Sequence, residues 1–268
     1  MPHSVLSVHE KRANPTNRAR RSLLPKEHGA WGQLLLPLIV ALGSARTPNL
    51  HAWALAAAGV ALFMAHEPFV VWLGQRGTRA AREHSDRALR HMGVWGLIAA
   101  AMGGAALLDT DWWVRGAASI ALTMVLVFVL AFLMRGTERS TPGELWLAFT
   151  MPAAAVPATL ALGNPPISAI TAWASFALAF SAGVFGVRGI IRWHKHRDAS
   201  AGWAGLCTVF AASVGLTMLA PREGAAALLF WAIAVGCRLA RPAPRALKRV
   251  GWCLVAGSVL QAAALLSS

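Results

Sequence analysis

Long runs of apolar residues recur along the whole chain, and this feature constrains the fold more than any other. A helix needs about 20 predominantly apolar residues to cross the hydrocarbon core of a bilayer. The runs do not alternate with a period of two, as the strands of a membrane β-barrel would. The sequence therefore predicts an all-α polytopic membrane protein with about nine transmembrane helices. The predicted spans lie near residues 29–44, 50–73, 92–108, 112–134, 144–162, 167–190, 202–220, 224–238 and 249–266.

The low content of charged residues supports this class. Only 13% of the 268 residues are charged, whereas soluble domains carry about 25%. No polar stretch between the runs is long enough to form a separate soluble domain. We therefore expect a single transmembrane helical domain over residues 21–268. Residues 1–20 are polar and show no hydrophobic periodicity, so we expect a disordered basic tail there.

The positive charges indicate how the spans are oriented. All but three of the 25 Lys and Arg residues fall in the amino-terminal tail or after the second, fourth, sixth and eighth spans; the exceptions are Arg46, Arg115 and Arg222. Short basic loops stay on the cytoplasmic side of a membrane. We therefore expect a bacterial inner-membrane protein with its amino terminus inside and its carboxyl terminus outside. Orientation and anionic lipid headgroups explain the net charge of +14, so membrane lipids are expected partners and nucleic acid is not.

The amino-terminal region also has features of a cleaved signal. The segment "ARRSLL", the apolar run and "LGSA" are similar to a secretory or twin-arginine signal with its cleavage site. However, Lys26, Glu27 and His28 interrupt the approach to the apolar run. Cleavage would also leave eight spans that begin on the wrong side. We therefore expect the first span to be retained.

Two patterns that could indicate a metal are weak. Cys207, Cys237 and Cys253 lie in apolar segments and show no CxxC spacing. The "HKHRD" segment at residues 194–198 has alternating histidines but no further ligands at a known spacing. We therefore predict no disulfide framework, no metal site and no cofactor.

Ionisable residues near the ends of four spans are the best candidates for function, because each such group inside a membrane costs about 2.5–3.5 kcal/mol. In the predicted topology all of them lie at or near the cytoplasmic interface. If the first, second, fifth and sixth spans pack together, these residues face one cavity that is open to the cytoplasm. The candidate ligand-binding residues are Lys26, Glu27, His28, Glu67, Glu144, Arg188 and Arg192, and the candidate catalytic residues are Glu67, His66, Glu27 and His28.

Glu67 is the deepest of these candidates. It lies well inside the second span, directly before Pro68, which removes a backbone donor and favours a kink or a local break. A buried carboxylate either has a raised pKa or finds a cation, for which Lys26 or Arg188 are available. The group could then take part in proton chemistry. Alternatively, it forms an ion pair that only fixes the packing of the helices.

Structural explanations compete for the other candidates as well. Glu27 and His28 fit a pocket or an interfacial helix start, where an acid favours the positive end of the helix dipole. Glu144 follows Pro142 and Gly143, and capping together with the dipole explains it. Arg188 and Arg192 share one helix face and suit a phosphate or carboxylate group, but ordinary interfacial anchoring explains them too.

Charges of both signs between the second and third spans, in "RGTRAAREHSDRALRH", predict an amphipathic helix on the membrane surface. In that setting His84 and His91 are expected to be solvated. We assign no catalytic role to this segment.

Four segments together resemble the YwiC-like family of bacterial integral membrane proteins. They are "LPKEHGAWGQLLLPLIVAL", "AHEPFVVWLGQRGTRAARE", "GTERSTPGELWLAF" and "GVRGIIRWHKHRDA", and the PKEHGAW block is the most specific element. The resemblance covers roughly residues 21–260. It implies a multi-pass inner-membrane protein and no established reaction.

The chain also bears a more distant similarity to the UbiA-type intramembrane prenyltransferases. Nine helices, an inside amino terminus and "RSTPGELWLAF" after the fourth span are the shared features. That resemblance implies a UbiA-like bundle. The prenyltransferases hold Mg²⁺ with two Asp-rich motifs, but here the corresponding segments read "HEPFVVWLGQRG" and "RGIIRWHKHRD". Magnesium needs clustered oxygen ligands, so these degenerate motifs argue against Mg²⁺.

We therefore expect a binding or transport role for an amphipathic anionic ligand, or one of the quinone or isoprenoid type, in a cytoplasm-facing cavity. Lys26, Arg188 and Arg192 would hold its head, and Glu67 or His66 would handle a proton or hydroxyl. One alternative is a prenyltransferase-like enzyme with an altered site. Another is an accessory subunit of a respiratory or biosynthetic complex. Enzymatic activity is the less favoured reading, and the sequence leaves the ligand and the oligomeric state open.

Overall fold

Nine helical rods make up the part of the chain that the computed structural model describes, which is residues 28–45, 47–198 and 200–267. The predicted tail at residues 1–20 lies outside these residues. Two of the rods contain more than one element: α4 continues into the π-helical segment η2, and α5 is followed directly by α6. The elements are α1 (His28–Gly43), α2 (Leu50–Trp72), α3 (Thr78–Leu108), α4 (Trp112–Phe128), η2 (Val129–Leu133), α5 (Thr141–Ala153), α6 (Ala155–Ala161), α7 (Pro166–His194), α8 (Ser200–Leu219), α9 (Pro221–Leu239), η3 (Pro244–Ala246) and α10 (Leu247–Leu266).

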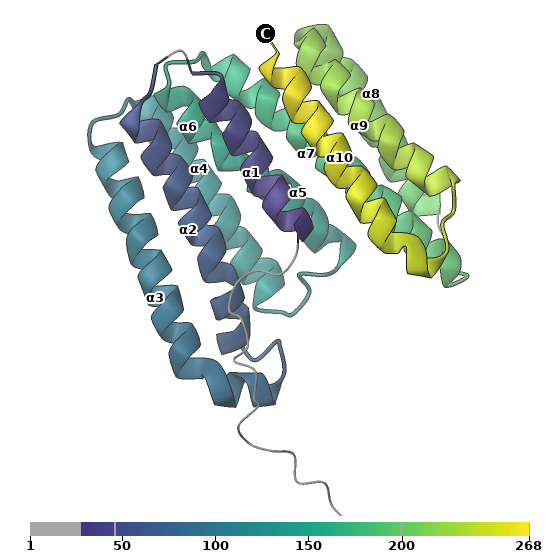
Figure 1. The fold of residues 1–268 in the computed structure, drawn as a ribbon, viewed down its shortest axis with the longest axis horizontal. Coiled ribbons are helices and arrows are strands. Elements are labelled where there is room, and N and C mark those ends of the chain that lie inside the picture. The colour runs from purple at the N-terminus through teal and green to yellow at the C-terminus, as the bar shows by residue number, and fades with distance from the viewer. Residues whose placement is uncertain (1–27, 46, 199, 268) are drawn as a thin grey trace, which may run out of the picture.

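The rods run up and down through one bundle, so the loops gather at two ends (Figure 1). We call the end with the loops 73–77, 134–140, 195–198 and 240–246 the basic end. The other end carries the loops 44–49, 109–111 and 162–165 and the carboxyl terminus. Helix α1 starts at the basic end and α10 finishes at the opposite end, as an odd number of rods requires. The predicted succession of nine helices is therefore found in the described residues, and seven of the nine qualify as membrane spans by length and composition.

Seven of the rods are long and apolar enough to cross a membrane. The chain is therefore a multi-pass membrane protein. Helix α1 is apolar but has only 16 residues, and α9 has 19 residues with charged residues close to both its ends. These two rods correspond to the first and eighth predicted spans, which are also among the shorter apolar runs.

Proline does not break the helices where the sequence predicted. Helix α2 continues through Pro68 without interruption, so of the predicted kink or local break the break is absent, and the kink stays a prediction. The break occurs in the fifth rod, between α5 and α6, where Pro152 and Pro157 lie five residues apart. Two missing N–H donors so close together remove two rungs of the helical ladder. The Ala154 amide between them donates a long bond to the Met151 carbonyl, at 3.4 Å.

Helix α3 is longer than the predicted third span. It begins at Thr78 rather than near residue 92, and its 31 residues include the segment predicted as a separate surface helix. At 1.5 Å per residue a helix of this length exceeds the thickness of a hydrocarbon core. Its charged first half therefore extends from the bundle at the basic end, beside α2 (Figure 1).

Small residues and a few polar contacts hold the helices of the bundle together. Helix α7 lies centrally, and its Ala, Ser and Gly residues let α5, α8 and α9 approach closely. At the end opposite the basic end, Arg115 donates to the Leu107 and Leu108 carbonyls at the end of α3. Arg222 donates to Ala264 at the end of α10. Cations favour the negative end of a helix dipole, which explains two of the three exceptions to the charge pattern.

Candidate functional site

Part of the predicted site lies outside the described residues. This applies to Lys26 and Glu27, and His28 is described only as the first residue of α1. The other predicted residues all lie at or near the basic end, on α2, α5 and α7. Their partners decide what each of them can do.

Glu67 is buried, as predicted, with 6% of its surface exposed. It accepts two hydrogen bonds from Arg76 in the loop after α2: Nε to Oε1 at 3.1 Å and Nη2 to Oε2 at 2.7 Å. The predicted partner Arg188 is wrong, because its guanidinium binds Glu144 instead. Arg76 follows Glu67 by nine residues, and the turn that ends α2 folds it back onto the helix. A bidentate pair of this kind stabilises the charged carboxylate.

Glu138 was not predicted, yet it lies beside His66, the residue that precedes Glu67. Its carboxylate oxygens lie 3.7 Å from His66 Nε2 and 3.9 Å from Arg139 Nε. The His66 imidazole and the charges of Arg76 and Arg139 hold the pKa of Glu138 below its ordinary value, although burial acts in the opposite direction. Ser140 caps α5 immediately after this loop, through a 3.2 Å bond from the Gly143 amide.

Glycine at position 143 allows the loop that contains Glu138 to lie close to the start of α5. A Cβ at Gly143 would collide with the backbone carbonyls of Thr137 and Glu138. The "STPG" segment, which the sequence suggested only as a helix start, therefore also holds the Glu138 loop against α5.

Glu144 and Arg188 form a second bidentate pair. Arg188 Nε lies 2.7 Å from Glu144 Oε2 and Nη2 lies 2.6 Å from Oε1. Arg188 also donates to the Arg139 carbonyl. The prediction that capping and the dipole alone explain Glu144 is therefore wrong: Ser140 is the cap, and the Glu144 carboxylate ties α5 to α7.

These contacts join into one array, which we call the ionic network. It runs from Glu67 and Arg76 through His66 and Glu138 to the Arg139 backbone, and ends at Arg188 and Glu144. The structure thus brings together Glu67, His66, Glu144 and Arg188, and the cavity that they were expected to face stays a prediction. Arg192 acts on a different group: its positive charge influences the Asp198 carboxylate in the loop after α7. The guanidinium groups of Arg76 and Arg188 are already held by carboxylates of the chain itself.

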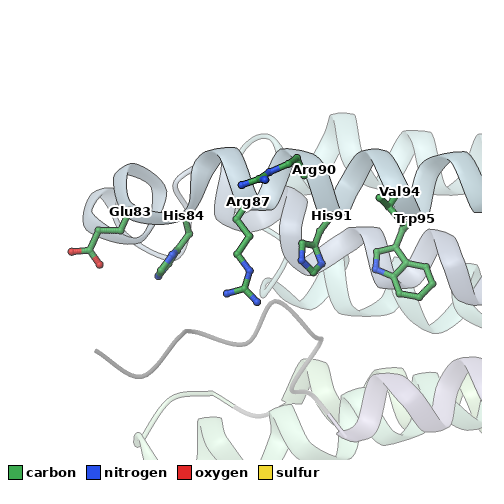
Figure 2. Close-up of a pocket in the computed structure, with 7 residues that line it drawn as sticks. All are labelled: Glu83, His84, Arg87, Arg90, His91, Val94 and Trp95. Atoms are coloured by element: carbon green, nitrogen blue, oxygen red, sulfur yellow. The ribbon is translucent and has the colours of Figure 1, made fainter. Parts of the chain in front are cut away.

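A hollow of about 800 Å³ lies along α3 at the basic end. Its described lining residues all belong to this one helix; they are Glu83, His84, Arg87, Arg90, His91, Val94 and Trp95, and include neither Glu67 nor Arg188 (Figure 2). His84, Arg87, His91 and Trp95 recur at helical spacing and point the same way from the helix (Figure 2). The acid in this set, Glu83, is paired with Arg79 at 2.9 Å.

The hollow changes character along the helix. Two arginines and two histidines line its first two turns, and Val94 and Trp95 lie one turn further, where the apolar part of α3 begins. His84 and His91 are half-buried, and their solvation stays a prediction. The signal for this surface was present in the sequence: residues 84, 87, 91 and 95 share one helix face. Its importance was missed because the segment was interpreted as a solvated surface helix.

A further buried cation lies away from the ionic network. Arg238 near the end of α9 is 5% exposed, bonds to the Phe185 carbonyl at 3.2 Å and lies 4.2 Å from the centre of the Trp203 ring. The glycines at 189 and 202 make room for its guanidinium, since a Cβ at either position would collide with it. Arg238 therefore fastens α9 to α7 and α8.

Among the described residues, no three His, Cys, Asp or Glu side chains come together as a metal site would require.

Comparison with known proteins gives one match. A family model described as YwiC-like protein matches residues 24–160, about half of the chain. No curated protein and no solved structure matches it. The predicted resemblance to UbiA-type prenyltransferases is thus not shown by these comparisons. The matched region includes Glu67, Arg76, Glu138 and Glu144, and also the hollow along α3.

Proposed function

The chain belongs to the YwiC-like family of membrane proteins, and from this premise we propose that it binds an amphipathic ligand with an anionic head. The head would lie in the hollow along α3, and an acyl or isoprenoid tail would continue along the apolar half of that helix. We further propose that the basic end faces the cytoplasm, because short basic loops remain on that side of a bacterial inner membrane.

The observation that carries this proposal is the order of residues along the hollow. Arg87, Arg90 and the two histidines offer donors for phosphate or carboxylate oxygens. Val94 and Trp95 then offer an apolar and aromatic surface one turn deeper. A headgroup followed by a hydrocarbon chain has the same order of polarity. The volume of about 800 Å³ lies within the range of ligand pockets.

The ionic network supports this role by fixing the neighbouring helices. Glu67 and Arg76 hold the end of α2, the helix that packs along α3. Glu144 and Arg188 join α5 to α7. Arg87 and Arg90 line the hollow itself, so we assign head recognition to these two residues.

The same network favours a second candidate function. In each bidentate pair the arginine and the glutamate satisfy each other's hydrogen bonds. Such pairs fix helices in place, as expected of an accessory subunit in a larger membrane complex. In that case loss of Arg87 would change neither lipid binding nor stability, whereas loss of Arg188 would lower stability.

Lipid titration followed by native mass spectrometry tests the proposal. Delipidated protein is titrated with phosphatidylglycerol and, separately, with phosphatidylcholine. A basic residue near an anionic surface contributes about 1 kcal/mol, so Arg87→Ala should raise the Kd for phosphatidylglycerol about five-fold. The double variant with Arg90→Ala should raise it about 30-fold, and the phosphatidylcholine Kd should change little.

Arg82→Ala is the matched control. Arg82 lies on the same turns of α3 and is exposed, but it does not line the hollow. If Arg82→Ala weakens binding as much as Arg87→Ala, the attraction is a general surface effect and the proposed site is wrong. Equal affinity of the protein for the two lipids would contradict the proposal as well.

A further inference from the structure

A second hollow lies at the end of the bundle opposite the basic end, and its volume is about 200 Å³. It lies where the two halves of the bundle meet: α1, α5 and α6 on one side, and α7, α9 and α10 on the other. Its apolar wall includes Pro37, Val40 and Phe176, and its polar lining includes Asn164, Trp173, Arg222 and Glu223.

The two charged residues in this hollow are in different situations. Arg222 uses Nε and Nη2 to donate to the Ala264 carbonyl, at 2.9 and 2.6 Å. Its guanidinium therefore caps the carboxyl-terminal end of α10. Within the described chain, the Glu223 carboxylate forms neither an ion pair nor a hydrogen bond; only its backbone carbonyl is bound, by Ser175. The hollow thus contains a carboxylate that no cation of the described chain neutralises.

Trp173 is an aromatic residue in the lining of the same hollow. Its indole N–H donates to the Phe149 carbonyl at 2.9 Å, and its ring lies 6.0 Å from that of Phe149. These contacts hold the ring in place. A fixed tryptophan face attracts cations, above all alkylated ammonium groups that carry hydrocarbon into an apolar pocket.

We propose that this hollow binds an organic ammonium group. Glu223 neutralises the charge, Trp173 contacts the cation through its ring, and the wall formed by Pro37, Val40 and Phe176 surrounds the alkyl substituents. A volume of about 200 Å³ suits a small ammonium ion or the ammonium part of a lipid headgroup. The site is separate from the hollow along α3, and its ligand has the opposite charge.

Calorimetric titration of the full chain in detergent with choline tests this proposal. The neutral isostere 3,3-dimethyl-1-butanol serves as the matched ligand, because it has the same shape without the charge. We expect saturable binding of choline and at least ten-fold weaker binding of the isostere. Glu223→Gln should weaken choline binding at least ten-fold, and Trp173→Leu should weaken it several-fold while Trp173→Phe restores part of the loss.

Asp111→Asn is the control, since Asp111 is an acid at the same end of the bundle but does not line the hollow. Binding of the isostere as tight as choline, or an equal loss in Asp111→Asn, would overturn the proposal. If Glu223→Gln does not fold, the two Trp173 variants test the proposal: choline binding unchanged in Trp173→Leu would overturn it. Nanodiscs with phosphatidylcholine in place of free choline distinguish the source of the ammonium group, and absence of binding in both forms would also overturn it.

Discussion

Neutralising Arg76 should destabilise the protein far more than neutralising an exposed arginine. In Arg76→Gln the Glu67 carboxylate loses the donors at 2.7 and 3.1 Å while it remains buried. Removing one partner of a buried pair costs about 3–5 kcal/mol. The Arg76 side chain retains 17% exposure and that of Glu67 8%, so we expect the lower end, about 3 kcal/mol.

The pair of Arg79 and Glu83 provides an internal comparison. Its nitrogen and oxygen lie 2.9 Å apart, almost as close as in the buried pair, but its side chains are 77% and 36% exposed. Exposed pairs four residues apart on a helix contribute about 0.3–0.5 kcal/mol. The two pairs have similar distances and differ in burial, and the buried pair is in addition bidentate.

Two double-mutant cycles measure the difference. Arg76→Gln and Glu67→Gln, singly and together, form the first cycle, and Arg79→Gln and Glu83→Gln form the second. The free energy of unfolding is obtained from reversible denaturation in mixed micelles. We expect a coupling energy of about 2 kcal/mol in the first cycle and at most about 0.5 kcal/mol in the second. Equal couplings, or an Arg76→Gln variant as stable as the parent, would refute the argument from burial.

Two further predictions concern other parts of the structure. The pKa of Glu138 lies below its ordinary value of 4.5, so its contribution to stability is complete above that pH and is lost as the pH falls through the lower folded-state pKa. The stability difference between the parent and Glu138→Gln should therefore shrink below about pH 4.5, and a difference that is constant with pH would contradict this. Gly189→Ala should lower the free energy of unfolding by about 1–3 kcal/mol, because the new Cβ displaces the Arg238 guanidinium. Gly215→Ala, where a Cβ meets nothing within 4 Å, should be neutral or slightly stabilising, and an equal loss in both variants, measured by thermal unfolding, would contradict the proposed clash.

The helical plan of the protein could be predicted because it follows from local properties of the chain. Each apolar run must satisfy its backbone groups internally, and in a bilayer a helix does so within a single segment. Basic residues at alternate loops then specify which ends lie together. The largest error in a predicted helix boundary was the start of α3. A helix with charged surface turns can continue without interruption into an apolar span, so the composition changes there although the backbone conformation does not.

The candidate residues could be predicted, but most of their partners could not. The cost of burying charge singled out Glu67 and Arg188, and both lie in the ionic network. Glu138 was not predicted because an acidic residue in a polar loop gives no sign that it is half-buried. Its closeness to His66 depends on how the loop folds over Gly143, and one sequence does not show that contact.

Periodicity and charge were thus enough to establish a multi-pass helical membrane protein whose basic loops share one end, because hydrophobic spans and helix caps are properties of neighbouring residues. The pairing of Glu144 with Arg188, 44 positions apart, and the positions of the two hollows depend on how separate helices pack. An arginine side chain reaches several partners from one backbone position. Which carboxylate it binds is therefore decided by the arrangement of the helices around it and not by its place in the chain.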